Sequence, residues 1–156
     1  MIINQNIDIF KCNAEAMVHC ANTHCTFGSG IAKQIKERYP EAYAADCQTI
    51  RGDKSKLGTF SWVKAKDGKY IYNLYGQADF GRGMRQLNYE AFYTGLESIK
   101  KHIEEHKLTT LSLPFHCGAD RAGGNWHIIN AMIESLWLND LTTTIYICKY
   151  TPEIDF

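Results

Sequence analysis

The sequence has no excess of charge of either sign and no long apolar run. Lys and Arg together number 17, as do Asp and Glu, so the formal net charge at pH 7 is zero. A general nucleic-acid or membrane-surface binder would carry a basic excess, so this balance argues against nucleic acid as a partner. No apolar stretch approaches a membrane span, and the first eight residues resemble no signal segment. The sequence therefore predicts a cytoplasmic protein with no membrane partner.

A disulfide framework is missing as well. The six cysteines are spread along a chain of ordinary domain size with no secretory signal, which favours free thiols. Hydrophobic residues make up 45% and charged residues 22% of the chain, which is typical of a globular domain and excludes a disordered chain. No internal repeat and no linker are visible, so we expect a single domain over residues 1–156.

Hydrophobic periodicity predicts strands that alternate with helices. Asn88 and Asn125 stand where helix caps are needed, and Asp67-Gly68 is typical of a hairpin turn. The alternation predicts a three-layer α/β/α sandwich whose central sheet is mixed because of the hairpin. The expected strands are 2–10, 16–21, 58–65, 69–75, 108–114 and 142–150, and the expected helices are 31–39, 41–49, 88–106 and 125–138.

Two junctions of strand, glycine loop and helix concentrate the polar chemistry. In the first, residues 18–21 end a strand, 28–30 form the loop and Ile31 begins a helix. Glycines let backbone amides approach a ligand, and the helix N-terminus favours an anion. The loop is not a Walker A motif, and Lys33 replaces the third glycine of a dinucleotide fingerprint. It is either a phosphate cradle or a tight turn into a helix.

The second junction, residues 113–126, has the same order of strand, glycine loop and capped helix. Open α/β sheets bind ligands at the carboxyl ends of their strands, so the two loops are expected to face one crevice. Paired amide cradles suit a pyrophosphate between two ribose-like groups. Asp120 lies in the second loop, where it either accepts local backbone hydrogen bonds or acts as a general base.

Together these segments resemble the two ligand loops of macrodomains, the ADP-ribose-binding family. The likeness rests on residues 18–22 with 27–32, and on 113–118 with 123–126. Residues 6–10 are similar to the family's opening Gly-Asp-hydrophobic motif, with Ile7 in place of glycine. Residues 70–77, Arg85 and 88–91 are similar to the small stand-alone branch. That branch contains ADP-ribose-1″-phosphate phosphatases, phage-type ones among them, and terminal ADP-ribose protein glycohydrolases.

The resemblance implies a role for each matching residue. Asp8 would accept a hydrogen bond from the adenine amino group, and Asn22 would meet the distal ribose. Asp120 and His19 would be catalytic. The other expected ligand contacts are Ile9, Phe27, Gly28, Ser29, Gly30, Ile31, Gln77, Cys117, Gly118 and Ala119.

Gln77 departs from the glycohydrolase pattern, which has a catalytic lysine there. A glutamine cannot attack the sugar carbon to form a Schiff base. The expected activity is therefore hydrolysis of a 1″-substituted ADP-ribose, above all ADP-ribose-1″-phosphate, with no metal and no cofactor. Deacylation of O-acetyl-ADP-ribose, mono-ADP-ribosyl hydrolysis and binding without turnover are the alternatives. The expected partner is an ADP-ribose derivative or an ADP-ribosylated protein, in the host cytoplasm if a phage encodes the chain.

Several of these residues have a second interpretation. His19 is either a catalyst or a buried core histidine, and Cys117 is either a buried thiol or a nucleophile. Phe27 either closes over the distal ribose or fills its loop. A zinc site is disfavoured because strand neighbours point to opposite faces and no Cys-x-x-Cys pair occurs. The candidate zinc ligands would be His19, Cys20, His24 and Cys25.

Overall fold

The computed structural model describes residues 1–28, 30–78, 85–119 and 122–150. A six-stranded sheet runs through it in the order β1-β6-β5-β2-β4-β3, and all neighbouring strands are parallel except β3 and β4. The strands are β1 (Ile2–Gln5), β2 (Ala16–Asn22), β3 (Phe60–Lys64), β4 (Tyr70–Gln77), β5 (Thr110–Pro114) and β6 (Thr144–Cys148).

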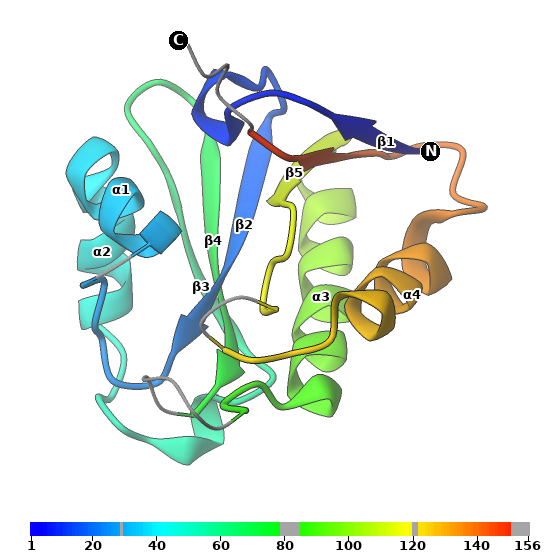
Figure 1. The fold of residues 1–156 in the computed structure, drawn as a ribbon. Coiled ribbons are helices and arrows are strands. Elements are labelled where there is room, and N and C mark those ends of the chain that lie inside the picture. Colours follow the sequence, from blue (N-terminus) through cyan, green and yellow to red (C-terminus); the bar gives the residue numbers. More distant parts are fainter. Residues whose placement is uncertain (29, 79–84, 120–121, 151–156) are drawn as a thin grey trace, which may run out of the picture.

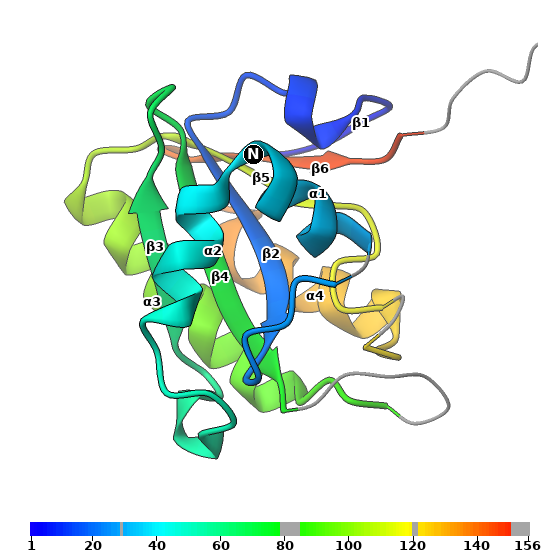
Figure 2. The same cartoon turned by 90° about the vertical axis from the view of Figure 1, so that its left-hand side faces the viewer.

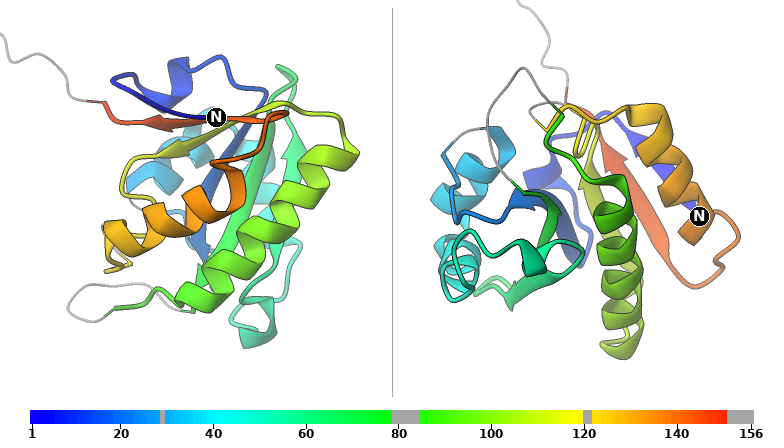
Figure 3. Two further views of the ribbon diagram at one scale, coloured as in Figure 1. Left: turned by 90° about the vertical axis from the view of Figure 1, so that its right-hand side faces the viewer. Right: turned by 90° about the horizontal axis from the view of Figure 1, so that it is seen from below.

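Helices cover both faces of this sheet. One face carries α1 (Gly30–Arg38) and α2 (Pro40–Cys47), and the other carries α3 (Tyr89–Glu105) and α4 (Trp126–Trp137). Figure 1 shows the two helix pairs on opposite sides of the strands, Figure 2 shows the α1 and α2 side, and Figure 3 shows α3 and α4 lying across the opposite face. The expected three-layer α/β/α sandwich with a mixed sheet is confirmed.

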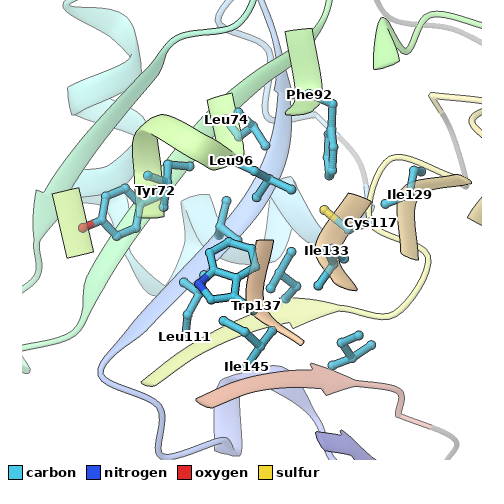
Figure 4. Close-up of a cluster of buried hydrophobic side chains, with 14 of the residues drawn as sticks. Tyr72, Leu74, Phe92, Leu96, Leu111, Cys117, Ile129, Ile133, Trp137 and Ile145 are labelled. Atoms are coloured by element: carbon cyan, nitrogen blue, oxygen red, sulfur yellow. The ribbon is translucent and has the colours of Figure 1, made fainter. Parts of the chain in front are cut away.

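Two apolar layers fix the sheet between the helices. Because side chains alternate along a strand, Val18 of β2 packs toward α3 and α4, whereas Met17 packs toward α1 and α2. On the α3 and α4 side, Phe92 and Ile133 meet buried strand residues such as Leu111 (Figure 4). The sheet is thus anchored on both faces, and the carboxyl ends of β2 and β4, the arrowheads in Figure 1, reach the same edge.

Local chemistry explains the turns and helix starts that the sequence predicted. Asn88 accepts a hydrogen bond from the Ala91 amide at 3.0 Å, and Asn125 accepts one from the His127 amide at 2.8 Å. Gly68 has a φ of 92°, which suits the hairpin turn between β3 and β4. The short 3₁₀ helix η2 (Lys54–Lys56) is an element that the sequence pattern did not predict.

The prediction of one strand from residue 2 to residue 10 is wrong. β1 ends at Gln5, and the chain then forms the 3₁₀ helix η1 (Ile9–Lys11). The Asp8 carboxylate accepts a hydrogen bond from the Phe10 amide at 3.0 Å and so caps η1. Ile9 is buried in the α1 and α2 layer instead of lying in the sheet. The other predicted elements end within two residues of the observed bounds.

No helix in the described ranges is both long and apolar enough to cross a bilayer.

Candidate ligand-binding site

A cavity of about 480 Å³ opens at the carboxyl ends of β2, β4 and β5. This volume falls within the range of small-molecule sites. Its walls come from the end of β2, the loop into α1, the first turn of α1, the end of β4 and the turn after β5. Of the predicted ligand contacts, the cavity brings together Asn22, Phe27, Gly28, Gly30, Ile31, Gln77, Cys117 and Gly118.

The other predicted residues lie elsewhere. Asp8, Ile9 and Ala119 do not line the cavity, nor does His19. Ser29 and Asp120 lie outside the described residues, so their expected roles stay predictions. The adenine contact of Asp8 also stays a prediction, because its observed partner is the Phe10 amide.

Internal hydrogen bonds shape the loop between β2 and α1. The Asn22 side chain donates to Thr26 Oγ1 at 2.6 Å and accepts from the His24 amide at 2.8 Å. Gly30 has a φ of 62° where α1 begins. Because Gly30 and Ile31 line the cavity, the positive end of the α1 dipole lies at its wall.

The turn after β5 is also held by its own backbone. The Cys117 amide donates to Pro114 O at 3.0 Å, and the Ala119 amide donates to His116 O at 2.7 Å. The expected phosphate donor at Cys117 is therefore already hydrogen-bonded within the turn. Gly118, with a φ of 77°, supplies an amide that has no internal acceptor among the described residues.

In the described part of the cavity wall, no charged side chain is present to hold an anion. None of its described lining residues is Lys, Arg, Asp or Glu. Burial, together with the neighbouring Cys117 thiol, raises the pKa of Cys20 well above its ordinary value, so Cys20 is an uncharged thiol at pH 7. Backbone amides and the N-terminus of α1 are thus the favourable groups for an anion in the described part of the site.

His19 lies one aromatic ring away from the cavity. Its side chain is fully buried, and Nε2 lies 2.6 Å from Asn73 Oδ1. The ring packs edge-on against Phe27, at 5.2 Å between centroids, and Phe27 lines the cavity. Burial lowers the pKa of His19 to about 4, against the hydrogen bond to Asn73, which raises it. The imidazole is therefore neutral at pH 7.

An aromatic wall is the part of the cavity that sequence reasoning missed. Phe115 and His116 both line the cavity and stack at 4.0 Å between centroids, and Trp126 packs edge-on against Phe115. Their signal was their position directly after a predicted strand, at the edge where ligands bind. The other lining residues without a predicted role are Cys20, Ala21, Thr26, Ala32, Pro114 and Ala122.

The fold and the two loops have counterparts among known proteins. A family model described as Macro domain matches residues 18–126. The chain belongs to this family. It is 31% identical over 125 residues to a 17.5 kDa protein from the tk-vs intergenic region of Enterobacteria phage T4, covering 76% of this chain and 77% of the phage protein.

Two further proteins are similar over most of this chain. A DNA ADP-ribosyl glycohydrolase of Mycobacterium tuberculosis is 27% identical over 151 residues, which are 94% of this chain but only 42% of that protein. The structure of Thermosipho africanus DarTG in complex with ADP-ribose superposes with a TM-score of 0.74 at 16% identity, covering 95% of this chain and 41% of that one. At that identity the structural likeness shows the fold alone.

Proposed function

We propose that the cavity binds ADP-ribose and that the protein hydrolyses a bond at C1″ of the distal ribose. The observation that carries this proposal is the single cavity enclosed by both glycine loops, with the N-terminus of α1 and the Gly118 amide at its walls. A diphosphate suits these donors because each offers partial positive charge without a charged side chain. Thermosipho africanus DarTG, part of which has the same fold, was solved in complex with ADP-ribose.

In the proposed pose, each part of ADP-ribose lies against a different segment of the cavity wall. The diphosphate lies against Gly30 and Gly118, and the distal ribose lies against Asn22 and Phe27. The adenine then extends toward η1, where Asp8 stands beyond the end of β1. In this pose the stacked Phe115 and His116 rings border the ligand between its two ends.

Within this class, ADP-ribose-1″-phosphate is the substrate that we favour. Asp120 would take a proton from a water molecule, whose oxygen attacks the phosphorus while the bond from phosphorus to the sugar oxygen breaks. Asp120 then returns the proton to the sugar oxygen, so the products are ADP-ribose and phosphate. Amides at the wall would stabilise the charge that develops on the phosphoryl oxygens. The geometry does not favour the expected acid role of His19, whose imidazole is neutral, fully buried and not part of the cavity lining.

A second candidate is removal of ADP-ribose from nucleic acid. The observation that favours it is the 27% identity to a protein named DNA ADP-ribosyl glycohydrolase. Gln77 lines the cavity in this chain, at the position where the glycohydrolase pattern has its lysine. In this second candidate reaction, a water molecule would therefore attack C1″ of the distal ribose, and no lysine–sugar adduct would form.

The test combines binding and turnover in the same protein. Calorimetry with ADP-ribose should show binding to the wild type, and its absence would contradict the proposed function. Phosphate release from ADP-ribose-1″-phosphate should fall by roughly 10²–10⁴ in Asp120→Ala, whereas ADP-ribose affinity should persist. An ADP-ribosylated oligonucleotide, assayed in parallel, decides between the two substrates. Tight binding with turnover of neither would instead support a protein that only recognises ADP-ribose.

Borohydride trapping examines the chemical route separately. With ADP-ribosylated substrate and borohydride, the mass of the wild-type protein should stay unchanged, because a Schiff base needs a lysine at the sugar carbon. The appearance of a reduced adduct on any lysine would contradict the water route and restore the covalent glycohydrolase mechanism.

A further inference from the structure

A chain of hydrogen bonds, buried at both ends, runs across the sheet from His19 to Asp46. His19 Nε2 lies 2.6 Å from Asn73 Oδ1, and Asn73 Nδ2 donates to Ser61 Oγ at 3.0 Å. Ser61 Oγ lies 2.7 Å from the Tyr75 hydroxyl, which donates to Asp46 Oδ1 at 2.5 Å. The chain thus joins β2, β4, β3 and α2 on the face of the sheet that carries α1 and α2.

The donors fix the direction of every bond in this chain. Asn73 Nδ2 also donates to Ala42 O at 3.0 Å, so both of its N–H groups are used. Asn73 Oδ1 can only accept, and therefore His19 Nε2 carries the proton. The Tyr75 hydroxyl donates its hydrogen bond to Asp46, so the Tyr75 oxygen accepts a hydrogen bond from the Ser61 hydroxyl. Each member donates to the next, an order in which neighbouring bonds strengthen one another.

Asp46 ends the chain as a fully buried acceptor. Burial raises its pKa, whereas the hydrogen bond from Tyr75 and the positive charge of Lys56 lower it. Lys56 is itself buried, lies 4.5 Å above the Tyr75 ring and donates to Thr23 O. The terminal carboxyl is therefore held by a hydroxyl and a nearby cation, and it accepts rather than donates at the end of the chain.

Each end of the chain leaves one buried acceptor without a hydrogen-bond partner in the described structure, namely Asp46 Oδ2 and His19 Nδ1. With the proton on Nε2, His19 Nδ1 has a bare lone pair, and this buried atom has no hydrogen-bond partner in the described structure. Buried polar atoms without partners are rare in folded proteins, and each calls for an explanation. The Phe27 ring, which packs edge-on against His19, itself lines the cavity. The next residue, Gly28, has open space around it, because an added Cβ there would meet no atom within 4 Å.

We propose that Asn73 is a positioning residue that fixes His19 with its proton on Nε2, and that His19 Nδ1 accepts a hydrogen bond from a ligand hydroxyl when Phe27 moves aside. The inference rests on the proposed function, since a ribose supplies such hydroxyl groups next to Phe27. In this proposal, His19 is a neutral hydrogen-bond acceptor that favours a sugar with a hydroxyl group at this position. A sugar that lacks the hydroxyl would leave Nδ1 without a partner and would bind less tightly.

Nitrogen NMR of the histidine rings tests the first half without any ligand. In the free wild-type protein at pH 7, long-range proton–nitrogen spectra should show His19 with Nε2 protonated and Nδ1 unprotonated. Assignment comes from the loss of this signal in His19→Gln. A proton on Nδ1 in the free protein would overturn the proposal, whatever the protein binds.

Adding ADP-ribose tests the second half. At saturation, the Nδ1 resonance should shift in the direction of hydrogen-bond acceptance while Nε2 stays protonated. An unchanged Nδ1 resonance in a protein that calorimetry shows to be saturated overturns the contact. Absence of any ADP-ribose binding refutes the proposed function instead, and leaves the proton position on His19 as a separate result.

Variants give the matched comparison. Asn73→Leu removes the acceptor of the His19 proton, so the ring should lose both its fixed tautomer and its fixed orientation, and the Kd for ADP-ribose should rise by up to about tenfold, the full effect of one lost hydrogen bond. Tyr72→Phe is the control, because it removes a buried hydroxyl bonded to His102 on the opposite face of the same strand. Its Kd should match that of the wild type, and an equal loss in both variants would contradict the positioning role. If Asn73→Leu does not fold, the two wild-type spectra still decide the proposal.

Discussion

Asp8 and Asp53 form a matched pair at the scale of single residues. Each caps a 3₁₀ helix, Asp8 by accepting from the Phe10 amide at 3.0 Å and Asp53 by accepting from the Ser55 amide at 2.9 Å. The sequence resemblance gives only Asp8 an adenine contact. If Asp8→Ala loses affinity and Asp53→Ala does not, the loss is therefore attributed to the missing adenine contact and not to the missing helix cap.

We expect Asp8→Ala to weaken ADP-ribose binding by about 1–3 kcal/mol, the usual effect of removing one hydrogen bond to a carboxylate. Asp53→Ala should leave the affinity unchanged. Calorimetry on the two variants and the wild type measures both effects under one condition. Equal affinities of the two variants would count against an adenine site beside η1.

The limits of sequence reasoning are also clearest at single residues. Gly28 and Gly118 were predictable at the cavity because strand–glycine–helix junctions place backbone amides at a sheet edge, whereas Asn22 was expected there only through the family resemblance. The packing of His19 against Phe27 was not predictable, because it depends on a side chain eight residues further along the chain. The same applies to Asn73, whose role follows from partners on three different elements.

Among the helices and strands, the boundaries that the sequence predicted well are those set by helix caps and turns. Asn88 and Asn125 start their helices through side-chain hydrogen bonds to nearby amides, an interaction that the sequence itself encodes. The first strand was overextended because Ile7 and Ile9 continue its alternating pattern. Burial of Ile9 under α1 and α2 overrides that pattern, and only tertiary packing reveals it.

Two glycines of the ligand loops should respond in opposite ways to a methyl group. At Gly124, an added Cβ would lie 2.6 Å from Gly118 O, a backbone atom of the turn after β5. At Gly28, an added Cβ would meet nothing within 4 Å. Overpacking against backbone forces the neighbouring segment to shift, whereas a methyl group in open space costs little.

We therefore expect Gly124→Ala to lower the free energy of unfolding by about 1–3 kcal/mol and to weaken ADP-ribose binding, since Gly118 must move. Gly28→Ala should change the free energy of unfolding by less than about 0.5 kcal/mol. Urea denaturation and calorimetry on the two variants measure stability and affinity. A Gly28→Ala protein as unstable as Gly124→Ala would show that the space beside Gly28 closes in solution.

Over the whole molecule, the net charge is zero, and the described part of the cavity wall also lacks charged side chains. A chain with zero net charge offers no general attraction to an anionic ligand, and the described cavity wall holds no charged side chain. Under the proposed function, the described part of the site would hold a diphosphate through oriented dipoles at short range. This arrangement needs rigid loops, and both ligand loops are held by internal hydrogen bonds.

The free energy of unfolding should decrease as the pH is lowered, because His19 is buried. Its pKa is about 4 in the folded protein and close to 6.5 in the unfolded chain, because burial disfavours the charged ring. Between these pH values the unfolded chain binds a proton that the folded protein does not bind. Unfolding therefore takes up a proton, and the free energy of unfolding decreases as the pH falls from about 6.5 to about 4. Above 6.5 both states are neutral, and this contribution does not change with pH.

The shift corresponds to about 3 kcal/mol over that interval. Urea denaturation of the wild type between pH 7 and pH 4 should show this loss, whereas His19→Gln should have a flatter profile. Asp46, whose pKa burial raises, acts in the opposite sense, and comparing the two proteins cancels its effect because both contain it. Parallel profiles for the wild type and His19→Gln would mean that the imidazole is hydrated in solution. His19 would then also have a partner for Nδ1 before any ligand arrives.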